Sequence, residues 1–173
     1  MTQIKIDPGA VRCLPEECQR IGMKKPLVVS DAGGRAAGVL DLARAALGPL
    51  PHAVFDGTPS NPTEAVVRAA LAVYQAQGCD GLISVGGGSS IDLAKGVAVL
   101  ASQPDARKTC ATIEGGSNKF TGAAAPLIFR PLPQDHPAHR HPGRVPGDAA
   151  SVDVTGLVAA RCCHLTRLNA VVR

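Results

Sequence analysis

The sequence predicts a doubly wound α/β domain built around a mostly parallel β-sheet. Short apolar runs rich in β-branched residues alternate with stretches of helical spacing, and the connections between them are short. Strands and helices that alternate in this way form right-handed crossovers, which give a parallel sheet covered by helices on both faces. The 173 residues are enough for one such domain with a buried core.

The elements follow one another in a regular order. We expect strands at residues 27–30, 52–55, 80–85 and 123–129, and helices at residues 35–47, 64–77 and 91–100. Gly48-Pro49 ends the first helix, and Gly78 ends the second. Apolar residues at helical spacing predict one buried face on each. The face of the first helix comprises Ala36, Val39, Leu40, Ala43 and Leu47, and that of the second comprises Val67, Ala70, Leu71 and Tyr74.

Composition argues against several classes of protein. No run approaches the roughly 18 apolar residues of a membrane span, and the first residues contain acidic side chains where a signal peptide would be apolar. Aromatic residues make up only 2% of the chain and the basic residues do not cluster, which argues against a nucleic-acid partner. The six cysteines show no CxxC spacing, so we expect reduced thiols in a cytoplasmic protein with no membrane partner.

The sharpest junction between a strand and a helix is the turn Gly86-Gly87-Gly88-Ser89. Ligands of parallel α/β sheets bind at the carboxyl ends of the strands, and a turn without Cβ atoms lets backbone N–H groups approach a phosphate. Ser89 and Asp92 also have capping-box spacing, with Ser89 as the N-cap. Alternatively, the glycines only permit close packing of strand and helix, and Asp92 only caps.

This stretch is not a G-x-G-x-x-G dinucleotide motif, because Ile91 stands at the last position. It resembles the signature G-G-G-S-x-x-D-x-A-K of the iron-containing (group III) alcohol dehydrogenase family, here Gly86 to Lys95. Other segments are similar to the same family in the same order, at residues 27–31, 59–63, 113–116 and 126–128. The resemblance covers residues 1–128 and implies a nucleotide-binding domain of the dehydroquinate synthase-like type.

The resemblance also implies roles for individual residues. Gly86, Gly87, Gly88 and Ser89 would hold the pyrophosphate of a nicotinamide dinucleotide. Asp31, at a strand end, would lie near the adenosine ribose and favour NAD over NADP, since a carboxylate repels a 2′-phosphate. Its alternative role is to cap the turn before Gly33-Gly34.

Three further polar residues have more than one interpretation each. Asn61, in the loop Pro59-Ser60-Asn61-Pro62-Thr63, would line the cofactor cleft by resemblance, or it forms an Asx turn. Asp92 caps the helix in our preferred interpretation and contacts the cofactor in the second. Lys95 would neutralise a phosphate, pair with Asp92, or be exposed without a function.

The family pattern stops near residue 128, and a second segment, 129–173, is rich in Pro, His and Arg. Composition alone suggests an irregular tail, which is either translated out of frame or the native end of a short protein. In the family, a helical domain follows whose Asp and His residues bind Fe²⁺ or Zn²⁺, and we expect no such metal on this chain. The tail does contain side chains that can bind a metal, but they are only weak candidates for a metal site. They are Asp135, His136, His139, His141, Cys162, Cys163 and His164.

The sequence is therefore consistent with two alternative functions. The first is an NAD-dependent, metal-dependent alcohol dehydrogenase acting on a small alcohol or aldehyde, present as a truncated chain of weak or no activity. The second is a non-catalytic nucleotide-binding or interaction fragment. The sequence leaves open the substrate and whether the chain forms a homo-oligomer.

Overall fold

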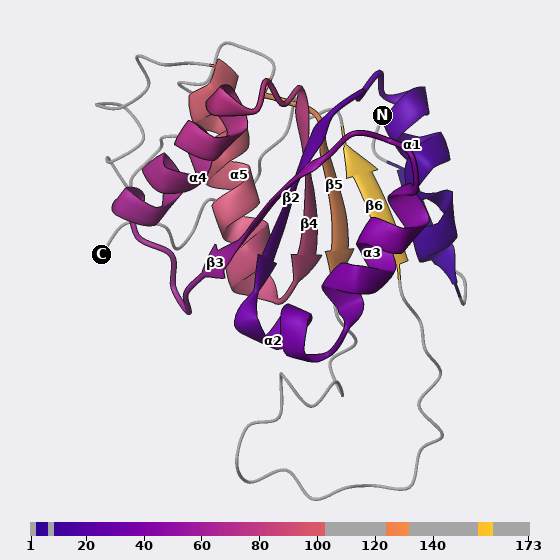
Figure 1. Cartoon of the computed structure of the whole chain (residues 1–173), viewed down its shortest axis with the longest axis horizontal. Helices are drawn as coiled ribbons and strands as arrows, with labels where there is room; N and C mark the ends of the chain where they lie inside the picture. The colour runs from indigo at the N-terminus through magenta and orange to yellow at the C-terminus, as the bar shows by residue number, and fades with distance from the viewer. Residues whose placement is uncertain (1–2, 7–8, 103–123, 132–155, 161–173) are drawn as a thin grey trace, which may run out of the picture.

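The computed structural model describes residues 3–6, 9–102, 124–131 and 156–160, and these form a layered α/β structure (Figure 1). Its central layer is a sheet of strand order β1-β6-β5-β4-β2-β3. The parallel strands are β2 (Pro26–Asp31), β3 (Ala53–Thr58), β4 (Gly81–Gly86) and β5 (Leu127–Pro131). Two antiparallel strands, β1 (Gln3–Ile6) and β6 (Gly156–Ala160), complete it. The mostly parallel α/β sheet predicted from the sequence is confirmed.

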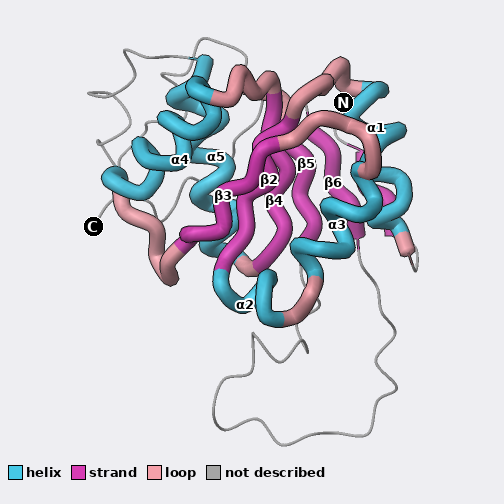
Figure 2. Tube along the Cα trace, in the orientation of Figure 1, coloured by secondary structure: helices cyan, strands magenta, loops and turns pink. Residues whose placement is uncertain are grey.

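Helices cover both faces of this sheet, as Figure 2 shows. One face carries η1 (Ala10–Cys13), α1 (Leu14–Arg20), α2 (Ala32–Ala36) and α3 (Val39–Leu47). The other face carries α4 (Glu64–Ala76) and α5 (Gly88–Ser102). Each face has its own apolar core, because alternate residues of the buried strands point to opposite sides. No helix in the described ranges is both long enough and apolar enough to cross a membrane.

The helix predicted at residues 35–47 is in fact two helices. Gly38 has a φ of 70°, a left-handed conformation that stops α2 and serves as the N-cap of α3. Val39, Leu40, Ala43 and Leu47 are buried as predicted, but Ala36 is exposed because it belongs to α2 and not to the buried face of α3. The predicted face of α4 is confirmed, with Val67, Ala70 and Tyr74 buried and Leu71 packed at the edge of the core.

The order of the parallel strands creates a switch point between β2 and β4. The connection from β2 through α2 and α3 leads to β3 on one side of β2, whereas β4 lies on the other side and continues through α5 to β5. The helices that follow β2 and β4 therefore cover opposite faces of the sheet. In open α/β sheets the crevice for ligands opens at this point, outside the carboxyl ends of the strands. Asp31 and Gly86 end the two strands concerned.

Candidate functional site

The glycine-rich turn lies at this switch point and connects β4 directly to α5. Gly86 has a φ of 152°, a backbone conformation that residues with a Cβ rarely adopt. Helix α5 begins at Gly88. The prediction that Ser89 is the N-cap and Asp92 its capping-box partner is therefore wrong, because Ser89 already lies inside the first turn and Asp92 lies beyond it.

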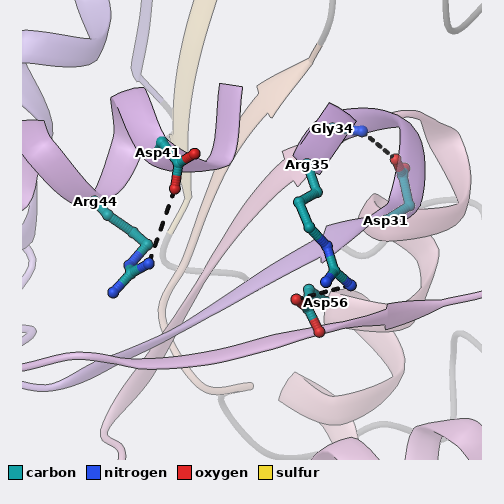
Figure 3. A network of polar contacts seen from close by, with 6 residues as sticks. All are labelled: Asp31, Gly34, Arg35, Asp41, Arg44 and Asp56. Carbon is teal, nitrogen blue, oxygen red and sulfur yellow. Dashed lines mark hydrogen bonds and ion pairs between the residues drawn. The ribbon is translucent and has the colours of Figure 1, made fainter. Parts of the chain in front are cut away.

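Asp31 connects the two central strands across the switch point. Its Oδ1 accepts a hydrogen bond of 2.7 Å from the backbone N–H of Gly34, which caps α2 (Figure 3). Its Oδ2 accepts hydrogen bonds from the backbone N–H of Gly87, at 3.2 Å, and from the hydroxyl of Ser90, at 2.8 Å. The capping role that was the alternative for Asp31 is present, and the same carboxylate also holds the glycine-rich turn.

The glycines of the turn meet very different surroundings. A Cβ on Gly86 would lie 2.6 Å from Ser90 Oγ and 2.8 Å from Asp31 Oδ2, too close for any side chain. A Cβ on Gly88 would meet no atom within 4 Å. Open space therefore lies before the first turn of α5, where backbone N–H groups have no partner within the helix and the helix dipole favours an anion. An anion such as a phosphate is the kind of group that the N-terminus of a helix favours.

Asn61 lies at the same edge of the sheet. It is exposed and adopts a left-handed conformation, with a φ of 54°, which Asn tolerates better than most residues. Its backbone N–H lies 3.4 Å from Ser89 Oγ, a long hydrogen bond that joins its loop to the first turn of α5. The structure thus brings Asn61 and Ser89 together, while their contact with a cofactor stays a prediction.

Asp92 and Lys95 form an ion pair on α5, with 3.7 Å between Asp92 Oδ1 and Lys95 Nζ. The Lys95 ammonium also lies 5.8 Å from the centre of the Phe129 ring, which is a cation–π distance. Of the interpretations of Lys95, the structure shows pairing with Asp92. Both side chains remain partly exposed, so contact with a ligand is sterically open to them.

Sequence reasoning missed Ser90 and Gly34, although both contact Asp31. Ser90 is a fully buried hydroxyl on the core side of a helix, a position that favours an apolar residue. Gly34 packs closely against β2, since a Cβ there would lie 2.6 Å from Ser30 Oγ. Two features of the sequence could have indicated these contacts. One is a serine, Ser90, at a core position of α5, and the other is Gly34, the second glycine of the pair that follows Asp31.

The groups with the clearest pKa shifts lie elsewhere, near the start of β2 and β4. Burial raises the pKa of the Cys18 thiol to about 12, and the nearby Asp80 carboxylate contributes. Burial, again with Asp80, raises the pKa of Tyr74 to about 12. Within the described part of the chain, no three His, Cys, Asp or Glu side chains gather as a metal site would require. The tail residues weighed as metal ligands lie outside the described residues.

Comparison with known proteins places this geometry in a family. The model of the iron-containing alcohol dehydrogenase family matches residues 1–132. The chain is 58% identical over 131 residues to 4-hydroxybutyrate dehydrogenase of Cupriavidus necator, covering 76% of this chain and 34% of that protein. It is 37% identical over 130 residues to 1,3-propanediol dehydrogenase of Klebsiella pneumoniae, covering 73% of this chain and 30% of that protein.

Solved structures agree with the sequence relatives. A 1,3-propanediol oxidoreductase superposes with a TM-score of 0.63 at 33% identity, over 75% of this chain and 35% of that one. The NADH-dependent butanol dehydrogenase A of Thermotoga maritima superposes with a TM-score of 0.59 at 26% identity, over 69% of this chain and 30% of that one. The chain belongs to the iron-containing alcohol dehydrogenase family, and it spans about a third of the length of these relatives.

Proposed function

We propose that this chain binds NAD(H) as the nucleotide-binding part of a metal-dependent alcohol dehydrogenase. The observation that carries the proposal is the glycine-rich turn at the switch point, with open space before Gly88 at the N-terminus of α5. The pyrophosphate would lie in this space, against the backbone of Gly88 and Ser89, whereas the predicted contact Gly87 is buried and donates its N–H to Asp31. Membership of the family supports this assignment, and one structural relative is named as NADH-dependent.

Asp31 supports the choice of NAD over NADP. The carboxylate stands at the end of β2, beside the glycine-rich turn, where the adenosine ribose is bound in doubly wound folds. There it would accept hydrogen bonds from ribose hydroxyls and repel a 2′-phosphate. Asp31→Ala should therefore narrow the difference in affinity between NADH and NADPH by about tenfold. Fluorescence titration with both nucleotides measures this change, and an unaltered ratio would place Asp31 away from the ribose.

The substrate class is a small alcohol, aldehyde or hydroxy acid. The relative with 58% identity is named for 4-hydroxybutyrate, an acid with a terminal alcohol. The metal of this family would supply a Lewis acid toward the alcohol oxygen. Among the described residues no three His, Cys, Asp or Glu side chains gather, and these residues would bind and orient the nucleotide.

The decisive experiment is titration of the purified chain with NADH, followed by its fluorescence. Gly88→Val should weaken binding by a hundredfold or more, because the new side chain fills the open space before α5 without a clash inside the protein. Ala72→Val is the matched control, since it adds the same branched side chain to the exposed surface of α4. If Gly88→Val folds and binds NADH as tightly as the starting chain, the site assignment is wrong.

A second candidate is a non-catalytic nucleotide-binding or interaction fragment. The two functions differ in turnover. NADH formation from 4-hydroxybutyrate or 1,3-propanediol with added Fe²⁺ or Zn²⁺ would support the dehydrogenase. NADH binding without turnover under these conditions would support the fragment.

We also propose a reducing, cytoplasmic location. Cys13, Cys18 and Cys79 are free thiols in the structure, and two of them are buried. Thiol titration of the unfolded protein, purified without reductant, tests whether these cysteines are reduced. In the folded protein Cys13 should react readily because it is partly exposed, whereas the buried Cys18 and Cys79 should react only on unfolding or slowly through partial opening.

A further inference from the structure

Ser90 combines burial with a direct contact to a residue of the proposed site. It lies in the first turn of α5, and none of its surface is exposed. Its hydroxyl donates a hydrogen bond of 2.8 Å to Asp31 Oδ2. A bound nucleotide cannot touch a side chain that is completely covered. Any influence of Ser90 on a ligand must therefore act through Asp31.

The Asp31 carboxylate is held from both of its oxygen atoms. The backbone N–H of Gly34 binds Oδ1, while Ser90 and the backbone N–H of Gly87 bind Oδ2. Gly34 and Ser90 belong to helices on opposite faces of the sheet, so the carboxylate is fixed in orientation across the switch point. Hydrogen bonds to a charged acceptor are stronger than those between neutral groups.

The contact between Ser90 and Asp31 leaves no room for a side chain at position 86. The position of a Cβ on Gly86 falls within 2.6 Å of Ser90 Oγ and 2.8 Å of Asp31 Oδ2. The hydrogen bond between Ser90 and Asp31 is therefore formed in the space that the missing side chain leaves. The absence of a Cβ at Gly86 thus allows Ser90 and Asp31 to meet.

We propose that Ser90 is a positioning residue that sets the preference for NAD over NADP by fixing the orientation of Asp31. This inference rests on the proposed NAD-binding function. With the Ser90 hydroxyl present, the carboxylate keeps one direction and one distance to the ribose. Without it, Oδ2 retains only the longer bond to Gly87 among these contacts, and the carboxylate gains freedom to rotate away from a 2′-phosphate.

The test compares Ser90→Ala with the starting chain in titrations with NADH and with NADPH. We expect the NADPH dissociation constant divided by the NADH dissociation constant to fall by roughly three- to tenfold. This is less than the full effect of losing one hydrogen bond to a charged group, because the bonds from Gly34 and Gly87 to Asp31 remain. Ser90→Cys keeps the volume but is a weak donor, and it should shift the ratio in the same direction. Ser102→Ala is the matched control, because that hydroxyl donates to the Ala98 carbonyl at the far end of the same helix. It should leave the ratio unchanged.

A double-mutant cycle on unfolding tests the contact without any nucleotide. Ser90→Ala and Asp31→Ala each remove the contact, and in combination they should change the unfolding equilibrium constant by less than the product of their separate effects. Coupling together with a changed nucleotide ratio supports the proposal. Coupling with NADH binding but an unchanged ratio overturns it and leaves the proposed function standing. Additive effects in the cycle also overturn it. Failure of the starting chain to bind NADH overturns both.

Discussion

Two aspartates tie the same pair of central strands together at opposite ends of the sheet. At the amino end, Asp80 precedes β4 and accepts hydrogen bonds of 2.8 Å from the backbone N–H groups of Lys24 and Lys25, which precede β2. At the carboxyl end, Asp31 ends β2 and accepts bonds from the turn and helix that follow β4. Both carboxylates join β2 to β4, yet only one stands at the switch point.

The difference lies in what surrounds each aspartate. At the amino end the first glycine of β4 is crowded, because a Cβ on Gly81 would lie 2.5 Å from Met23 Cε. At the carboxyl end Gly88 faces open space. The same bridging chemistry therefore lies among packed side chains at one end, and at the other it holds a buried turn that leads to the exposed Gly88 at the start of α5. Substitutions at the two ends should separate stability from binding.

The largest expected effect is that of Gly86→Val. The substitution forces a branched side chain into a backbone conformation that favours glycine and against both Asp31 and Ser90. Strain and overpacking together should lower the free energy of unfolding by roughly 4 kcal/mol. Urea denaturation measures this loss. Gly88→Val is the control, and it should keep nearly all of the stability. Equal losses for the two variants would contradict the contrast between crowded and open glycines.

Alkaline pH should lower the stability of the protein through Cys18, which lies near Asp80 at the amino ends of β2 and β4. The pKa of Cys18 is about 12 in the folded protein against an ordinary 9.0, so the folded state retains a proton that the unfolded state releases. Stability from this group is complete below pH 9 and is lost as the pH rises toward the folded pKa. Between pH 9 and about 11, Cys18 alone should account for a fall of about 2 to 3 kcal/mol in the free energy of unfolding.

The control for this titration is Cys18→Ala. It should be less stable at neutral pH because a buried side chain is shortened, but its stability should fall less steeply above pH 9. Tyr74, whose pKa is also raised to about 12, still titrates in that variant. Denaturation curves at several pH values give both slopes. If the two proteins lose stability in parallel between pH 9 and 11, Cys18 is not the group responsible.

The matched pair Asp80→Asn and Asp31→Asn sharpens the comparison directly. Each amide keeps one acceptor oxygen and sets an N–H donor against a backbone donor, so each should cost about 1 to 2 kcal/mol of stability. Only Asp31→Asn should also change the affinity for NADH and the discrimination against NADPH. Denaturation measures the stability of both variants, and fluorescence titration measures their affinities for NADH and NADPH. An altered NADH affinity in Asp80→Asn would show that the two ends are not independent.

Much of this fold could be predicted because its signals are local. The alternation of apolar strands and helices gave the parallel sheet, and the buried face of α4 followed from helical spacing. The break at Gly38 was missed because a helical pattern of apolar residues continues across it. Strand β1 was missed because it is short and is fixed by pairing with distant residues. The prediction of an irregular tail is wrong at residues 156–160, because β6 forms there by pairing with β1 and β5, and no local pattern indicates such pairing.

The candidate site was predictable only in part. The glycine-rich turn could be located because the glycines directly follow an apolar run that predicts a strand, and this signal is local in the sequence. The contacts of Asp31 with Gly87 and Ser90 join residues 56 and 59 positions apart, and no spacing rule predicts such pairs. The expected N-cap at Ser89 failed because α5 begins at Gly88, so a serine suited to capping lies inside the helix.

The smallest expected effect is that of removing an ion pair near the carboxyl ends of the strands, which Figure 3 shows between α2 and β3. Arg35 Nη2 lies 2.9 Å from Asp56 Oδ2, but the Arg35 side chain is 57% exposed. Water screens such pairs, so Arg35→Gln should change the free energy of unfolding by less than about 0.5 kcal/mol. Its effect should shrink further in 1 M salt. A loss comparable to that of Asp31→Asn would mean that charge near this edge, and not hydrogen bonds to a buried turn, stabilises the switch point.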